Sequence, residues 1–71
     1  GTINYALGSA MNVRLELHNE LGMLVRTVEH GWKESGTYSV SCDTHGLPSG
    51  NYFIKLSSDE ETQTRQITVV K

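Results

Sequence analysis

The segment GLPSGNYFIKL, at residues 46–56, constrains the fold more than any other part of the chain. Pro48 and the two glycines around it predict a tight corner, because proline fixes φ at about −65° and glycine tolerates positive φ. A tyrosine just after such a corner can bury its ring and donate its hydroxyl to nearby backbone. After the corner the side chains alternate between two faces, with Tyr52, Ile54 and Leu56 on one and Asn51, Phe53 and Lys55 on the other. We therefore predict a corner that leads into a central strand.

The segment from Met11 to His18 also alternates strictly. Its apolar residues, which a strand would place on one face, are Met11, Val13, Leu15 and Leu17. A helix would instead bring Arg14 and His18 onto the face of Met11 and Leu15. The pattern therefore predicts a half-buried strand.

The other predicted strands are short. Residues 23–28 have apolar side chains of both parities, which indicates a bulge or burial on both faces. In the closing segment, Ile67 and Val69 lie on the expected core face. Alternation predicts the remaining strands at residues 2–7, 37–42 and 62–71.

Polar segments separate these strands. Residues 29–36 are polar and contain two glycines, so we expect a loop there, and residues 57–61 read as an acidic loop. About six to seven strands without a helix predict an all-β fold, a small antiparallel immunoglobulin-like or fibronectin III-like β-sandwich. We expect one domain over residues 1–71, with a stability of about 3–5 kcal/mol because so short a chain buries little apolar area.

Charge and hydropathy exclude several classes of function. The net charge is −2 and the six basic residues are scattered, whereas nucleic-acid binding needs a clustered basic patch. No apolar run approaches the roughly 20 residues of a membrane-spanning helix, so we expect no membrane insertion. The predicted partners therefore do not include nucleic acid.

No group of residues predicts catalysis, a metal or a cofactor. The sequence Cys42-Asp43-Thr44-His45 supplies too few ligands for structural zinc, and the parity of Cys42 predicts a small buried side chain rather than a nucleophile. Asp59-Glu60-Glu61 reads as a solvated hairpin tip, since it lacks the spaced oxygen ligands of a calcium site. We expect no catalytic residue.

Two aromatic residues leave alternatives open. Trp32, on the predicted loop, either folds back to cap the core or stays exposed beside His30 and Lys33 to contact a sugar or a partner. Phe53 points outward from its strand, where packing under a neighbouring domain would cover it.

The order of strands and turns resembles the C-terminal sorting domain of type IX secretion cargo proteins of Gram-negative bacteria, which is akin to the immunoglobulin-like domain of flagellar hook-capping proteins. The Asn-Pro element usual before the family's opening strand is missing, so we expect the domain to begin upstream of Gly1. Cys42 also departs from the family, which often has an aromatic or aliphatic residue there. The segments that carry the resemblance are residues 2–7, 13–22 with the "LG" turn, 36–40, 46–56 and 64–71.

The resemblance implies a sorting signal rather than an enzyme. In that family the secretion machinery recognises the folded domain on the periplasmic side, the upstream cargo crosses the outer membrane, and a sortase-like peptidase generally removes the domain. The cargo is secreted or reaches the cell surface after a transient periplasmic stage. Two other classes remain open: a non-catalytic accessory or spacer module of a secreted hydrolase or adhesin, and a flagellar hook-capping scaffold domain.

The resemblance also implies which residues are recognised. By analogy the corner residues hold the fold there, and the terminal strand presents an edge to a receptor strand. Lys71 would add a polar contact or guard that edge against aggregation. We expect a monomer, and self-association through the same edge strand is an alternative that the sequence leaves open. The implied recognition residues are Leu47, Gly50, Tyr52, Ile67, Val69 and Lys71.

Overall fold

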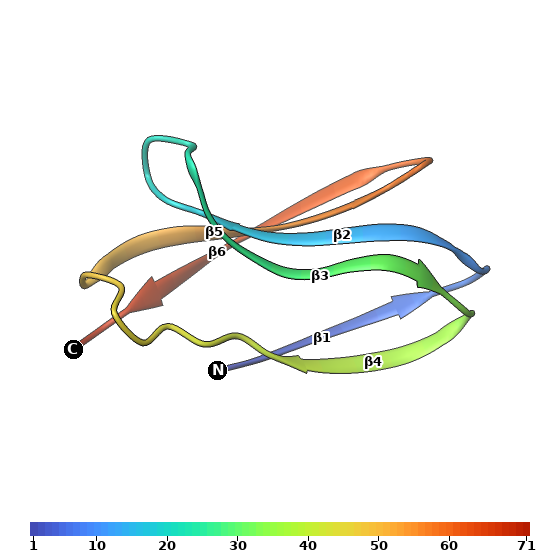
Figure 1. Ribbon diagram of the computed structural model, residues 1–71, viewed down its shortest axis with the longest axis horizontal. Coiled ribbons are helices and arrows are strands. Elements are labelled where there is room, and N and C mark those ends of the chain that lie inside the picture. Colours follow the sequence, from blue (N-terminus) through green and yellow to red (C-terminus); the bar gives the residue numbers. More distant parts are fainter.

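Two antiparallel sheets of unequal size face each other in the computed structural model of residues 1–71 (Figure 1). The larger sheet has the strand order β3-β2-β5-β6, and the smaller one pairs β1 with β4. The predicted all-β sandwich is confirmed, with six strands and no helix that could cross a membrane. The strands are β1 (Thr2–Leu7), β2 (Met11–His18), β3 (Leu24–Lys33), β4 (Gly36–Ser41), β5 (Gly50–Ser58) and β6 (Thr62–Val69).

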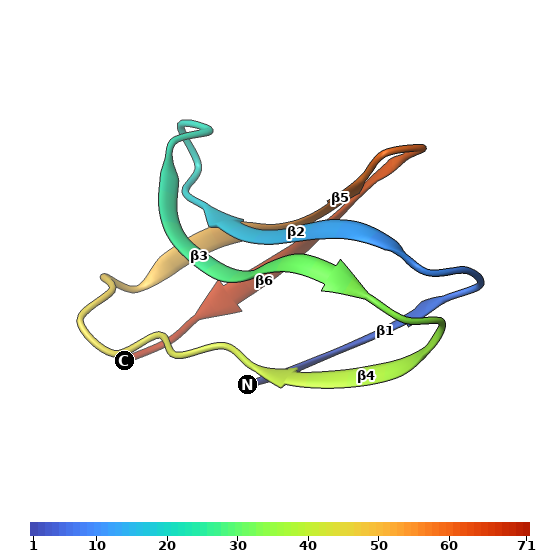
Figure 2. The ribbon, with the colours of Figure 1, turned by 45° about the vertical axis from the view of Figure 1, so that its right-hand side comes forward.

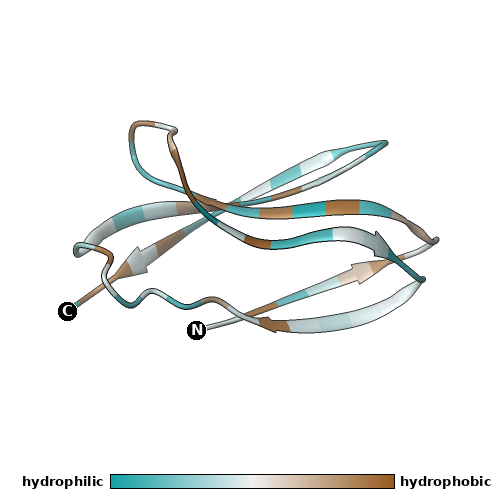
Figure 3. Ribbon diagram, viewed as in Figure 1, coloured by the Kyte–Doolittle hydropathy of each residue, from teal (hydrophilic) through white to brown (hydrophobic).

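The core lies between the sheets, mainly under β2 and β5. Leu15 and Leu17 are fully buried, and the alternation predicted for their strand appears as alternating bands along β2 in Figure 3. Cys42 is buried as well, which confirms its predicted inward orientation. The cluster of buried side chains consists of Leu15, Leu17, Cys42, Tyr52, Ile54 and Val69.

The corner before β5 has the predicted geometry. Gly46 adopts a φ of 81°, which a side chain would disfavour, and Gly50 has a φ of 157° at the start of the strand. The Tyr52 ring is buried and its hydroxyl donates to the carbonyl oxygen of Pro48 at 2.7 Å. This bond satisfies the only polar atom of the buried ring and fixes the corner to the strand.

The structure corrects the prediction for β3. We expected a strand at residues 23–28 followed by a loop at 29–36, but the strand runs continuously from Leu24 to Lys33 (Figure 2). Its pairing with β2 shifts register twice, so Val25 and Val28 have no Cα partner and both pack against the core. These bulges account for the mixed parity of the segment.

Trp32 therefore lies on a strand, not on a loop. It sits on β3 opposite Asn12 of β2, and 59% of it is exposed. Of the two alternatives left open for Trp32, the structure excludes the core cap, because the position of Trp32 on β3 points it away from the interior, and it leaves the exposed arrangement. By contrast, residues 59–61 form the predicted exposed tip of the β5–β6 hairpin, although the loop is shorter than the expected 57–61 because Ser57 and Ser58 belong to β5.

Candidate recognition surface at the corner and the terminal strand

Pairing between β5 and β6 brings the sequence-predicted recognition residues to one end of the larger sheet. Gly50 lies opposite Val69, and Tyr52 lies opposite Ile67. Lys71 lies two residues beyond the end of β6 and contacts the corner. We call this group of Leu47, Gly50, Tyr52, Ile67, Val69 and Lys71 the corner–terminus site.

Most side chains of this site face the interior. Tyr52 and Val69 are buried, while Leu47 and Ile67 are half-buried and pack against the core. A partner would therefore meet the backbone and the rim of the corner rather than these side chains. Their contribution is to set the shape of the surface.

Lys71 joins the end of the chain to the corner. Its backbone N–H donates to Ser49 Oγ at 3.0 Å, and its Nζ donates to the Thr44 carbonyl oxygen at 2.8 Å. The side chain thus lies against residues 44–49 and not along the free edge of β6. The sequence interpretation did not single out Thr44 or Ser49, although a hydroxyl residue in a Pro-Ser-Gly turn is a common partner for nearby backbone.

Segment 43–47 is held in place by further polar contacts. The guanidinium of Arg26 donates to the carbonyl oxygens of Asp43 and His45, and the Leu47 N–H donates to Thr44. The His45 N–H donates to the Asp43 carboxylate at 2.8 Å, and this bond, aided by Arg26, lowers the pKa of that carboxyl. The corner is therefore ordered before any partner binds.

The terminal strand β6 lies at the edge of the larger sheet, with no strand on its outer side. Its outer backbone N–H and C=O groups are available to another strand. Arg65 is the single charged residue between Thr62 and Val69, so the edge has no acidic side chain. This arrangement suits the addition of an extended segment.

The other sequence candidates lie outside the corner–terminus site. Trp32 lies on β3, the opposite edge strand of the same sheet. Phe53 is half-buried on β5 between its neighbours His18 and Gln66. No group of three or more His, Cys, Asp or Glu side chains is arranged to hold a metal ion.

A family model for the secretion system C-terminal sorting domain matches residues 1–71, the whole length of the chain. The chain therefore belongs to the C-terminal sorting domains of the type IX secretion system. No match was found among curated proteins or among solved structures. Membership means that the domain is a sorting signal, that it interacts with the secretion machinery, and that it serves export to the cell surface or the medium.

Proposed function

We propose that the secretion machinery recognises this folded domain through the corner–terminus site and then moves the upstream cargo from the periplasm across the outer membrane. A sortase-like peptidase removes the domain afterwards, and the domain itself catalyses nothing. One observation carries the proposal: the residues implied by resemblance, which are far apart in sequence, meet at one end of the sheet. An edge strand anchored to an ordered corner is the kind of rigid surface that a receptor strand can extend.

A reporter fused upstream of the domain, in a bacterium with a type IX system, tests this proposal. Deleting residues 67–71 would remove Val69 from the core and so confound loss of recognition with unfolding. Deleting only Val70 and Lys71 keeps β6 intact, because both lie beyond the strand and are exposed. We expect export to fall at least tenfold with little change in thermal unfolding.

A matched control alters the other end of the same strand. Thr62 is exposed, distant from the corner and outside the lining of any cavity on this face, so its alanine variant should be exported normally. Normal export after deletion of Val70 and Lys71 would rule out recognition through this end of the domain. Mass spectrometry of the exported reporter then establishes whether the domain has been cut off.

The exposure of Trp32 supports a second candidate, a sugar-contacting accessory role. Trp32 and His30 are both exposed on β3, and a flat aromatic ring beside polar groups can stack on a sugar. Affinity electrophoresis in gels containing polysaccharide measures this directly. Retardation that disappears in Trp32→Ala supports the accessory role, and unretarded migration of the unaltered domain excludes it for the polysaccharides used.

A further inference from the structure

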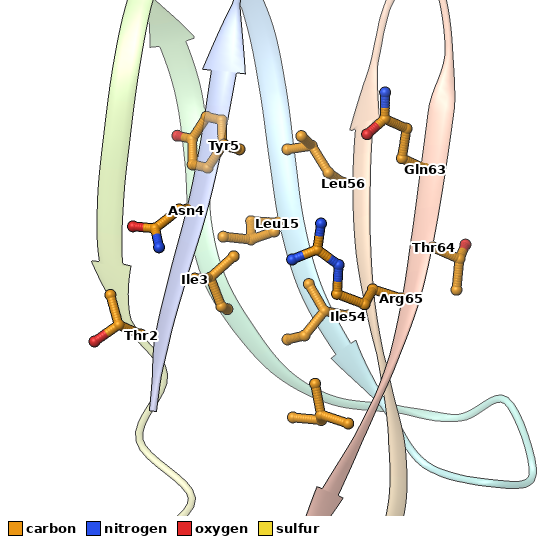
Figure 4. Close-up of a pocket in the computed structure, with 11 residues that line it drawn as sticks. Thr2, Ile3, Asn4, Tyr5, Leu15, Ile54, Leu56, Gln63, Thr64 and Arg65 are labelled. Carbon is orange, nitrogen blue, oxygen red and sulfur yellow. The ribbon is translucent and has the colours of Figure 1, made fainter.

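A cavity of about 140 Å³ opens between β1 of the smaller sheet and β6 of the larger one (Figure 4). Its floor is formed by Leu15, Ile54 and Leu56 from the core face of β2 and β5. The two-stranded sheet leaves this part of the four-stranded sheet uncovered, because no strand follows β1 on its outer side. The cavity is thus an opening into the apolar interior along one side of the sandwich.

The size of the cavity limits what can fill it. An apolar cavity of roughly 150 Å³ holds one benzene-sized group. This one would therefore take a single Phe or Leu side chain and not a whole folded element. Ile3 on β1 and Ile67 on β6 both line it, so the inserted group would contact hydrocarbon from each of the two walls.

Free strand edges border the cavity. β1 pairs only with β4, and β6 pairs only with β5, so the outer edge of each carries unpaired backbone groups. An extended segment lying along either edge satisfies these groups and directs every second side chain towards the cavity. Residues 63–67 of β6 border the opening, which corresponds to a segment of about five residues at about 3.3 Å each.

Arg65 is the single charged residue that lines the cavity. Figure 4 shows its guanidinium extending from β6 towards β1, and no ion pair or hydrogen bond engages it. An unpaired cation at an apolar opening favours an occupant that supplies a carboxylate. Side chains two residues apart along a strand lie on the same face. A carboxylate two residues from the inserted aromatic side chain would therefore lie beside it on the face towards the cavity.

We propose that this cavity receives an extended segment of the secretion machinery, which inserts one large apolar side chain and pairs a carboxylate two residues away with Arg65. The inference rests on the proposed function for the source of the segment. Beyond that function, it specifies which side chains the bound segment carries, whereas backbone pairing along a strand edge would accept almost any sequence. Insertion completes the uncovered side of the sandwich by adding the strand that this side lacks.

A peptide titration tests the inference without the export apparatus. The probe is acetyl-Thr-Glu-Thr-Phe-Thr-Glu-Thr-amide, which offers a carboxylate on either side of the anchor and so binds in both strand directions. Added to the ¹⁵N-labelled domain, it should shift the amide signals of residues 2–5 and 63–67 saturably. Replacing the peptide's Phe by Ser, or Arg65 by Glu, should weaken binding about tenfold or more.

Charge exchange provides the decisive control. A peptide with Lys in place of both Glu should bind the Arg65→Glu variant better than it binds the unaltered domain. Arg14→Glu, on the opposite face of the larger sheet, should leave binding of the acidic peptide unchanged. Absence of saturable shifts, shifts confined to β3, or equal binding by Arg65→Glu would each overturn the proposal.

Two other occupants produce distinct results. If a second copy fills the cavity, sedimentation will show a dimer of the free domain that Arg65→Glu disrupts, and the proposal fails. If Arg65 only guards the edge, Arg65→Leu will promote self-association while the peptide does not bind, and the proposal also fails. Export separates this inference from the proposed function: full export of Arg65→Glu, together with loss of export on deleting Val70 and Lys71, rejects the cavity as a docking site and retains the corner–terminus site.

Discussion

The two long sides of the sandwich are closed in different ways. On one side, four residues form a polar and aromatic group across the sheets, which we call the latch: Tyr5, Glu29, Lys33 and Tyr38. On the other, no hydrogen bond or ion pair joins β1 to β6, and a cavity opens between them. A small sandwich can thus hold its layers together from one side and leave the other side free for a partner.

The latch combines hydrogen bonds, an ion pair and ring stacking. Tyr5 donates to Glu29 at 3.0 Å, Lys33 pairs with the same carboxylate at 2.6 Å, and the rings of Tyr5 and Tyr38 stack with centroids 5.1 Å apart. Lys33 also lies 5.5 Å from the centre of the Tyr38 ring. Side chains alone therefore connect the β1–β4 sheet to β3 of the larger sheet.

These contacts change the protonation equilibria of the latch. The ammonium of Lys33 donates to Glu29 and lowers the pKa of that carboxyl, and the Glu29 carboxylate in turn raises the pKa of Lys33. Burial, followed by the hydrogen bond to Glu29, raises the pKa of Tyr5 to about 12. The latch is most stable when Glu29 is ionised and Tyr5 is protonated.

The largest effect is expected under the open side. Leu15→Ala removes a fully buried side chain from the cavity floor and should lower the free energy of unfolding by about 3 kcal/mol, measured by urea denaturation. Leu21→Ala, at an exposed position, should change it by less than about 0.5 kcal/mol. A cost for Leu15→Ala below about 1 kcal/mol would mean that the open side is not part of the core.

A smaller effect is expected in the latch. Tyr5→Phe and Glu29→Gln should each destabilise the domain by about 1–2 kcal/mol, with a coupling energy of about 1 kcal/mol in the double variant. The matched pair on the open side, Asn4→Ala with Thr64→Ala, should show no coupling, because no bond joins them. Equal coupling energies for the two pairs of variants would mean that the side with the latch and the side with the cavity are not closed differently.

The latch should also give the domain a defined pH dependence. The pKa of Glu29 is lowered from its ordinary value of 4.5. The ionised carboxylate therefore contributes to the free energy of unfolding above that pH, and this contribution is lost as the pH falls through the folded-state pKa. The Tyr5 contribution is intact below pH 10 and is lost as the pH rises from 10 towards 12.

Urea midpoints measured against pH check both limbs. Glu29→Gln should flatten the acid limb only in part, since the lowered pKa of Asp43 acts in the same direction. Tyr5→Phe should flatten the alkaline limb. Profiles that superimpose on that of the unaltered domain would contradict the assignment of these limbs to the latch.

The smallest effect is expected for Arg65→Ala. Because Arg65 is exposed and unpaired, its truncation should change the free energy of unfolding by less than about 0.5 kcal/mol. Thermal and urea unfolding measure this directly. A decrease in the free energy of unfolding above about 1 kcal/mol would show that Arg65 stabilises the open side. Both sides would then be held together by side chains, though by different kinds of contact.

Local patterns predicted those parts of the fold that depend on neighbouring residues. The strand at residues 11–18 followed from a period of two, and the inward orientation of Cys42 followed from its parity with Tyr38 and Val40. The hydroxyl bond of Tyr52 was predicted because its acceptor, Pro48, lies only four residues away. Each of these features is decided within one short segment.

Features set by distant partners could not be predicted in this way. Residues 29–36 were interpreted as a loop because they are polar and contain two glycines. Pairing with β2 and the bond between Glu29 and Tyr5 nevertheless make residues 29–33 part of a strand. The division into sheets of two and four strands likewise depends on which edges pair. The members of the corner–terminus site were named by resemblance, and only the β5–β6 register showed that Gly50 faces Val69.

The single thiol of this domain, Cys42, is buried among the core side chains, with 6% of the residue exposed. A thiol reagent can therefore modify it only during fluctuations that separate the layers. The rate of labelling under native conditions becomes a measure of how often the sandwich opens, read from one atom without added probes. Comparing that rate in variants of the latch with the rate in variants of the cavity would show from which side the domain begins to come apart.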